Sequence, residues 1–190
     1  GLRVKSPYSL KDMAKDSIAV LDELEIGEAN IIGASMGGMI AQTVAYDFPE
    51  RTRSLISIMS TTWAPHLPPP GREQEQGISD MNESSAEQAE NLEKIGFYPS
   101  ALPNQVTAIL SAGDRTTQVG TIEAPTLVLH GADDELLSVE HGKHTAEVIS
   151  GAKLKIYKNM GHSLPDHVIP EMVSDILGHL SKKPKLASSE

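Results

Sequence analysis

A serine between glycines is the first residue of this sequence whose setting indicates chemistry. The hexapeptide GASMGG places Ser35 between a short apolar run and a helical segment. A sharp strand-to-helix turn would hold Ser35 in a strained conformation with its hydroxyl exposed, and Gly33 and Gly37, which lack a Cβ, permit such a turn. The backbone N–H of Met36 would then face a developing oxyanion. The pattern predicts Ser35 as an acyl-transfer nucleophile, Met36 as an oxyanion-hole donor and Gly38 as a residue that lets the helix approach the sheet.

A serine nucleophile needs a base, and two later loops offer the remaining groups. One loop contains His162, and the other contains Asp133 and Asp134. Both loops follow predicted strands, and the carboxyl ends of parallel strands gather at one edge of a sheet. We therefore expect His162 to act as the base and one of the two aspartates to orient it.

The remaining histidines are weaker candidates for a catalytic or metal-binding role. His130 ends a predicted strand and is interpreted as structural, and His167 follows the base loop and serves as a control position. His141 and His144 are three residues apart on a predicted helix, a spacing that can bind a metal, but no third ligand is evident. We expect these two side chains to lie on a solvated helix face.

The spacing of apolar residues predicts strands that alternate with helices. The predicted helices span residues 8–25, 38–48, 103–112, 139–149 and 166–180, and the predicted strands span residues 29–33, 54–59, 126–130 and 154–157. Leu10, Ala14 and Leu24 are expected on one face of the first helix. This order predicts an α/β fold, with a mostly parallel sheet flanked by helices.

The segment between the second and third strands has a different composition. It contains the run Leu67-Pro68-Pro69-Pro70-Gly71, which fits neither a sheet ladder nor a helix interior, and a short polar helix is expected at residues 86–95. We interpret residues 61–104 as a short cap insertion on a core made of residues 1–60 and 105–181, followed by a polar tail at 182–190. The larger apolar side chains of this segment are expected either to line a pocket or to pack in the core. They are Trp63, Leu67, Phe97 and Tyr98.

The composition excludes several classes of protein. The 190 residues carry a formal net charge of −10, which disfavours nucleic acid as a partner. No apolar run approaches the ~20 residues that span a bilayer. The absence of cysteine excludes disulfides, thiolate metal sites and a cysteine nucleophile, and fits a cytoplasmic protein.

The sequence resembles the α/β-hydrolase superfamily, in particular its bacterial carboxylesterase-like members. The resemblance rests on GASMGG, on PTLVLHGADD at residues 125–134 and on Met160-Gly161-His162. It implies the order Ser35, Asp134, His162, since the family places the acid three residues after the glycine that is Gly131 here. It also implies hydrolysis of small to medium carboxylic esters through an acyl-enzyme, without metal or organic cofactor.

Other activities remain open on the same three residues. A cofactor-free haloperoxidase or a carbon–carbon hydrolase would use the same triad, and an inactive binding protein would retain it. The chain also departs from the family at its front, because the strands that precede the nucleophile strand and the loop with a second oxyanion donor are not found. We expect the first helix to cover one face of strand 29–33 and the nucleophile helix the other, and the open strand edge favours a homo-oligomer.

Overall fold

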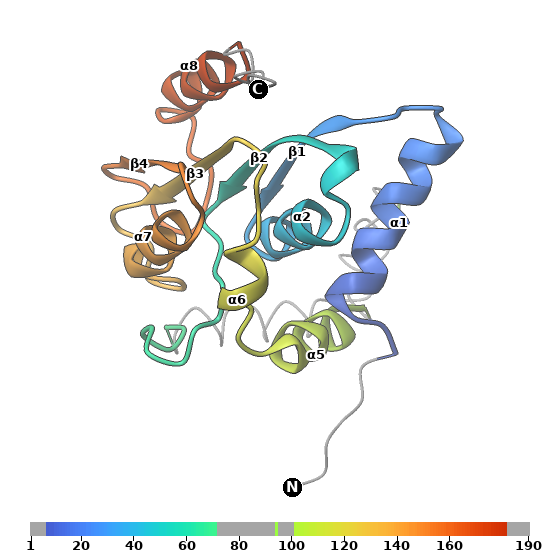
Figure 1. Ribbon diagram of the computed structural model, residues 1–190. Coiled ribbons are helices and arrows are strands. Elements are labelled where there is room, and N and C mark those ends of the chain that lie inside the picture. Colours follow the sequence, from blue (N-terminus) through green and yellow to red (C-terminus); the bar gives the residue numbers. More distant parts are fainter. Residues whose placement is uncertain (1–6, 72–93, 95–100, 182–190) are drawn as a thin grey trace, which may run out of the picture.

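A parallel sheet of four strands forms the centre of the structure (Figure 1). The computed structural model describes residues 7–71, 94 and 101–181. The strands are β1 (Ala29–Ala34), β2 (Thr52–Ile58), β3 (Thr126–Gly131) and β4 (Lys153–Tyr157), in that spatial order and all parallel. The predicted α/β class with a parallel sheet is confirmed.

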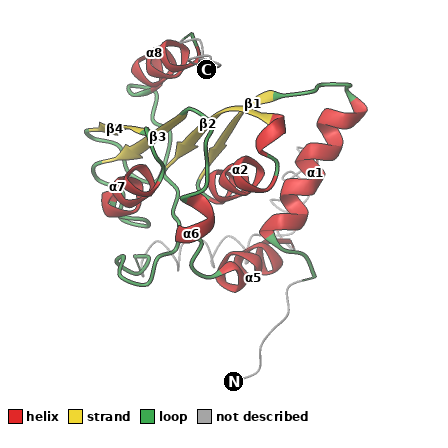
Figure 2. Cartoon of the chain, viewed as in Figure 1, coloured by secondary structure: helices red, strands yellow, loops and turns green. Residues whose placement is uncertain are grey.

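Helices cover both faces of the sheet (Figure 2). They are α1 (Leu10–Glu23), α2 (Met36–Asp47), α5 (Leu102–Ala112), α6 (Thr116–Val119), α7 (Val139–Val148) and α8 (Ile169–Leu180), with a 3₁₀ turn at Pro49–Arg51. Figure 1 shows α2, α6 and α7 on one side of the sheet and α8 on the other. Two separate apolar clusters result, one between the sheet and α8 and one between the sheet, α2 and α6.

The first helix, predicted over residues 8–25, spans Leu10–Glu23 and buries only part of the predicted face. Ser9 caps α1, because its side chain accepts from the Asp12 N–H while the Asp12 carboxylate accepts from the Ser9 N–H. The buried side chains are those of Leu10, Ala14 and Ile18. Leu24, which we predicted on the buried face, is 61% exposed. The helix packs against α2, so its contact line is narrower than the full apolar stripe.

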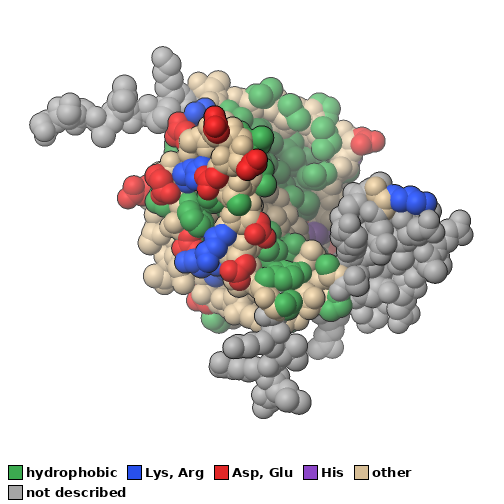
Figure 3. All heavy atoms as spheres, turned by 90° about the vertical axis from the view of Figure 1, so that its right-hand side faces the viewer, with side chains coloured by type: hydrophobic (Ala, Val, Ile, Leu, Met, Phe, Trp, Pro, Cys, Tyr) green, Lys and Arg blue, Asp and Glu red, His purple; other side chains and the backbone are tan. Residues whose placement is uncertain are grey.

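Strand β1 lies at an edge of the described sheet and pairs only with β2. Ile31 packs on the side of α1 and α2, in a cluster with Ala14 and Ile18, whereas Ile32 on the opposite face is 50% exposed. The expectation that α1 and α2 cover opposite faces of β1 is therefore wrong, because α1 packs on α2. On this side of the molecule, hydrophobic side chains are exposed beside a group of charged ones (Figure 3).

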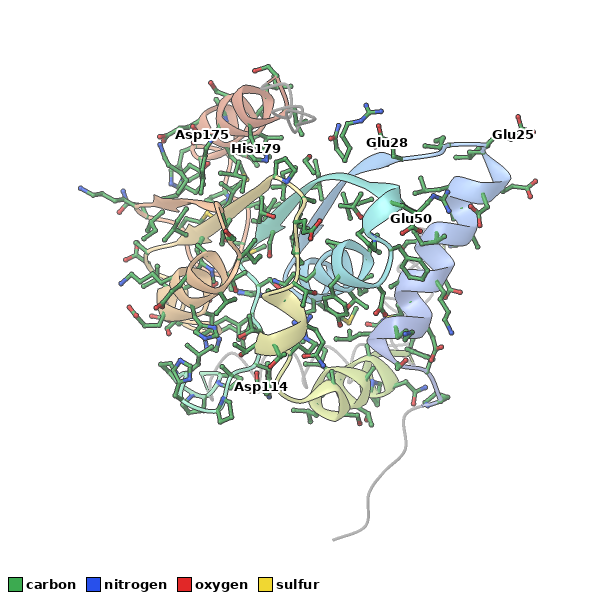
Figure 4. All side chains as sticks on the ribbon, in the orientation of Figure 1. Glu25, Glu28, Glu50, Asp114, Asp175 and His179 are labelled. Atoms are coloured by element: carbon green, nitrogen blue, oxygen red, sulfur yellow. The ribbon has the colours of Figure 1, made fainter. Side chains whose placement is uncertain are left out.

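Polar contacts tie the last helix to the sheet. Asp175 and His179 lie on the side of α8 that faces the strands (Figure 4). The Tyr157 hydroxyl donates to Asp175 Oδ2 at 2.8 Å, and His179 Nε2 lies 3.2 Å from the carbonyl oxygen of Pro125. The helix begins at Ile169, later than the predicted residue 166, because Pro170 suits the first turn of a helix.

Only part of the segment interpreted as a cap, residues 61–104, lies among the described residues. Residues 61–71 form a loop without helix or strand, and α5 returns the chain to the core. Except for Lys94, which is helical, the helix predicted at 86–95 falls outside the described residues, as do Phe97 and Tyr98. Within the described part of the chain, no helix combines the length and apolar character needed to cross a membrane.

Candidate active site

Ser35 occupies a strained turn between β1 and α2. Its backbone has φ 53° and ψ −122°, and α2 begins at the next residue. Two hydrogen bonds fix this conformation from the neighbouring strand. The Ser35 N–H donates to the Ile58 carbonyl at 2.9 Å, and the Ser60 hydroxyl donates to the Ser35 carbonyl at 2.9 Å. Positive φ in a serine costs of order 1–3 kcal/mol, and such strain is commonly found at functional sites.

The glycines of the turn have unequal roles. A Cβ on Gly33 would lie 2.0 Å from the carbonyl oxygen of Gly37, and one on Gly38 would lie 2.6 Å from Ser60 Cβ. The close approach of strand and helix therefore requires glycine at both positions, as expected. A Cβ on Gly37 would meet no described atom within 4 Å, so the predicted steric need for glycine there is wrong.

The loops that follow β3 and β4 lie side by side. The Ala132 N–H donates to the Tyr157 carbonyl at 2.8 Å, and the Asp133 N–H donates to the Met160 carbonyl at 3.0 Å. A Cβ on Gly131 would lie 2.1 Å from that Met160 oxygen. Glycine at this position therefore lets the acid loop and the base loop touch.

Three polar side chains form a hydrogen-bonded chain at this edge of the sheet. His162 Nε2 lies 2.8 Å from Ser35 Oγ, and His162 Nδ1 lies 2.8 Å from Asp134 Oδ2. A carboxylate accepts only, so Nδ1 carries the proton and Nε2 is free to accept from the serine hydroxyl. The arrangement has the geometry of a nucleophile, a general base and an orienting acid.

Asp134 is held as a buried carboxylate. Its Oδ1 accepts from the backbone N–H groups of Leu136 at 3.0 Å and Leu137 at 2.9 Å. Burial raises the pKa of Asp134, but hydrogen bonds from His130, His162 and Leu137 outweigh this effect and lower the pKa well below 3.8. The carboxylate therefore stays charged opposite His162.

The neighbouring aspartate and the nearby histidines make no described hydrogen bond to Ser35 or His162. Asp133 is exposed and uses its backbone N–H to hold the base loop. His130 is fully buried, with Nε2 2.8 Å from the Leu137 carbonyl and 3.4 Å from Asp134 Oδ2, which supports the structural interpretation. His167 Nε2 lies 3.1 Å from the Asn159 carbonyl.

His141 and His144 do not lie on a solvated helix face, contrary to our expectation. They are 3% and 9% exposed. His141 Nδ1 lies 2.7 Å from Thr61 Oγ1, and His144 Nδ1 lies 3.0 Å from Thr62 Oγ1. These two contacts fasten the loop after β2 onto α7, which explains why both rings are buried.

A cavity of about 220 Å³ opens beside Ser35. Helix α2 contributes Met36 and Met39 to its wall, and α5 contributes Val106, Ile109 and Leu110. Met36, the predicted oxyanion donor, is the first residue of α2, where backbone N–H groups lack partners within the helix.

Two loops complete the cavity. Thr61, Trp63 and Pro70 come from the loop after β2, and Leu136 and Leu137 come from the loop after Asp134. Trp63 thus lies where the sequence suggested a pocket wall. Leu67, also predicted to line the pocket, is only partly buried and is not part of the wall, because the chain turns at Ala64–Leu67.

A buried arginine supports the cavity wall from behind. The Arg115 side chain is 3% exposed and donates to the carbonyl oxygens of Met39 and Thr61 and to Gln42 Oε1. Its backbone N–H donates to the Thr62 carbonyl at 2.9 Å. It joins the nucleophile helix to the loop after β2. No sequence signal singled it out, because an isolated arginine ordinarily predicts a surface position.

Comparisons with known proteins agree with the fold. The family described as alpha/beta hydrolase fold matches residues 3–87. The Rhodomycin D methylesterase DauP of Streptomyces sp. (strain C5) is 24% identical over 91% of this chain and 74% of its own length. A 2-hydroxy-6-oxononadienedioate/2-hydroxy-6-oxononatrienedioate hydrolase of Cupriavidus pinatubonensis is 28% identical over 84% of this chain and 65% of its own. The crystal structure of a hydrolase from Pseudomonas aeruginosa PA01 superposes with a TM-score of 0.73, at 24% identity, over 93% of this chain and 73% of that one.

Proposed function

We propose that this chain, which belongs to the α/β-hydrolase fold superfamily, is a serine hydrolase that cleaves carboxylic esters through an acyl-enzyme on Ser35. The observation that carries the proposal is the hydrogen-bonded chain from Ser35 Oγ through His162 to Asp134, with 2.8 Å at each link. The strained turn that exposes Ser35 and the cavity beside it support the same conclusion. The similarity to a methylesterase supports an ester as the substrate.

In the proposed reaction each group has a separate role. Ser35 Oγ attacks the ester carbonyl carbon while its proton passes to His162 Nε2. Asp134 holds the Nδ1–H tautomer and stabilises the imidazolium, and the backbone N–H of Met36 faces the developing oxyanion. His162 then gives its proton to the leaving alcohol. In the second step His162 takes a proton from a water molecule while the water oxygen attacks the acyl carbon. His162 then returns that proton to Ser35 Oγ as the bond between Oγ and the acyl carbon breaks and the acid leaves.

Turnover of a chromogenic ester tests the proposal. Ser35→Ala and His162→Ala should each abolish hydrolysis of p-nitrophenyl acetate. The double variant should be no slower than either single variant, because the two groups act as one unit. Ser17→Ala is the matched control, since Ser17 is exposed on α1 and its hydroxyl contacts only the Met13 carbonyl. A Ser35→Ala variant that retains most of the activity would overturn the assignment.

Hydrolysis of a carbon–carbon bond is the second candidate. It is supported by the similarity to the 2-hydroxy-6-oxononadienedioate hydrolase, whose named substrate is a dicarboxylate. Such a substrate would need cationic or hydrogen-bonding partners for its carboxylates. Turnover of a 2-hydroxy-6-oxo-dienoate, followed by loss of its absorbance, with no turnover of simple esters would favour this candidate over the first.

A further inference from the structure

The described residues that line the cavity beside Ser35 offer no charge to a ligand. The described lining holds no lysine, arginine, histidine, aspartate or glutamate side chain. Apart from Ser35, the side chains with a polar atom in that lining are Trp63, whose indole N–H is uncharged, and Thr61, whose hydroxyl is already used. His141 Nε2–H donates to the Pro68 carbonyl, so Nδ1 accepts from the Thr61 hydroxyl at 2.7 Å, and Thr61 Oγ1 accepts from the Trp63 N–H at 2.8 Å.

The buried arginine nearby does not supply the missing cation. Arg115 directs its guanidinium N–H groups to the carbonyl oxygens of Met39 and Thr61 and to Gln42 Oε1. Its Nε has no partner among the described residues, but this atom is sealed from the solvent. The Arg115 guanidinium therefore bonds to groups behind the cavity wall and does not face a ligand. A carboxylate placed in the cavity would lose its hydration without gaining a charged partner among the described residues.

The size of the cavity limits the group that it can hold. A cavity of about 150 Å³ accepts a benzene ring, and drug-sized ligands occupy about 300–1,000 Å³. The volume here is about 220 Å³. At the same cavity volume per carbon atom as for benzene, this cavity holds about nine carbon atoms. The acyl group is bonded to Ser35 from the first step until water releases it in the second, whereas the alcohol leaves in the first step. We therefore place the acyl group in the cavity that Ser35 lines.

We propose that this cavity binds an uncharged, apolar acyl group of about six to nine carbon atoms and excludes acyl groups that end in a carboxylate. The proposal rests on the ester hydrolysis proposed above and specifies its substrate class. It predicts that kcat/KM rises about fourfold for each methylene added to the acyl chain, until the cavity is filled.

A matched pair of esters tests this inference. p-Nitrophenyl hexanoate and the mono-p-nitrophenyl ester of adipic acid share a six-carbon acyl chain and differ in a terminal carboxylate. We expect kcat/KM to be at least about 100-fold higher for the hexanoate at neutral pH. Equal values for the two esters, or a rate that does not change from acetate to hexanoate, would overturn the inference.

A charge placed at the mouth of the cavity should change this preference. Leu110 lines the cavity, yet it is 60% exposed, so Leu110→Arg should leave the fold intact. The adipate-to-hexanoate ratio of kcat/KM should rise at least about tenfold, because the guanidinium can pair with the carboxylate. Leu177→Arg on α8 is the control, since Leu177 is also 60% exposed but lies outside the cavity lining.

The Leu177→Arg control distinguishes pairing of the guanidinium with the substrate carboxylate from the effect of a changed net charge. The net charge of −10 disfavours anionic esters everywhere on the surface, and both variants change it equally. Equal changes in the ratio for the two variants would contradict the inference. Labelling of Ser35 by an alkyl fluorophosphonate, run in parallel, keeps the two proposals apart. Labelling without the expected ester preference overturns only the substrate class, whereas the absence of labelling overturns the proposed function as well.

Discussion

Replacing Gly33 by alanine should damage both stability and catalysis, by amounts that follow from the turn around Ser35. The added Cβ would lie 2.0 Å from the Gly37 carbonyl oxygen and 2.8 Å from the Gly38 nitrogen. Both are backbone atoms, so the start of α2 must move away from β1. Overpacking of this kind costs about 1–3 kcal/mol, which in a chain of this size lowers Tm by roughly 2–12 °C. A shift of about 1 Å at the nucleophile can lower kcat/KM about 100-fold.

Gly37→Ala is the matched control for this change. Gly37 belongs to the same motif and lies in the first turn of α2, but its added Cβ meets no described atom within 4 Å. Alanine in a helix is favoured over glycine by about 0.5–1 kcal/mol, so this variant should be as stable as the parent or slightly more stable. Thermal melts and p-nitrophenyl ester kinetics measure both variants. If Gly37→Ala proves as damaging as Gly33→Ala, the steric argument is wrong.

Four further substitutions test the surroundings of the site. Asp134→Asn should lower kcat by about 10⁴-fold through the wrong imidazole tautomer, whereas Asp133→Asn should change it less than about threefold; the opposite ranking would assign the acid to Asp133. Burial lowers the pKa of His141 and His144, so protonation favours the unfolded chain. Their contribution to stability is complete above about pH 6.5 and is lost as the pH falls from there through the lowered pKa values. Melts between about pH 5 and 8 should therefore show a smaller acid-induced fall in Tm for His141→Gln than for the parent, and an equal fall would count against this account. Arg115→Met leaves the Thr61 carbonyl and Gln42 Oε1 without donors, whereas the Met39 carbonyl still accepts from the Thr43 hydroxyl. Urea unfolding should therefore show a loss of about 1–3 kcal/mol for each buried group left unpaired, and an unchanged midpoint would refute the supporting role.

The order of strands and helices could be predicted because each element carries its own periodic pattern. The ends of the elements were harder to place. Helix α2 begins at Met36, before the predicted residue 38, because the strained Ser35 ends the strand and starts the helix at once. The exposure of Leu24 also escaped prediction, since periodicity identifies an apolar face but not the width of its contact with a neighbour.

The larger differences between prediction and structure arise from contacts between residues that are far apart in the sequence. His141 and His144 have a helical spacing that is compatible with a solvated face, and only the loop at Thr61 and Thr62, far away in sequence, buries them. The same loop brings Trp63 and Pro70 against α5 to form the cavity. The loops of Ser35, Asp134 and His162 could be placed at a common edge because they follow strands of one parallel sheet. The choice of Asp134 over Asp133 rests instead on the spacing implied by the resemblance to the α/β-hydrolase superfamily.

Covalent labelling of Ser35 tests most directly whether this serine is an activated nucleophile. The protein is treated with a fluorophosphonate, digested and analysed by mass spectrometry. The hydrogen bonds from Ser35 Oγ to His162 and from His162 to Asp134 predict a single adduct, on the peptide that contains Ser35, which forms far more slowly in His162→Ala. Ser17 and Ser163, both exposed, should remain unmodified. Labelling at those serines to the same extent as at Ser35, or at an unchanged rate in His162→Ala, would contradict the proposed chemistry.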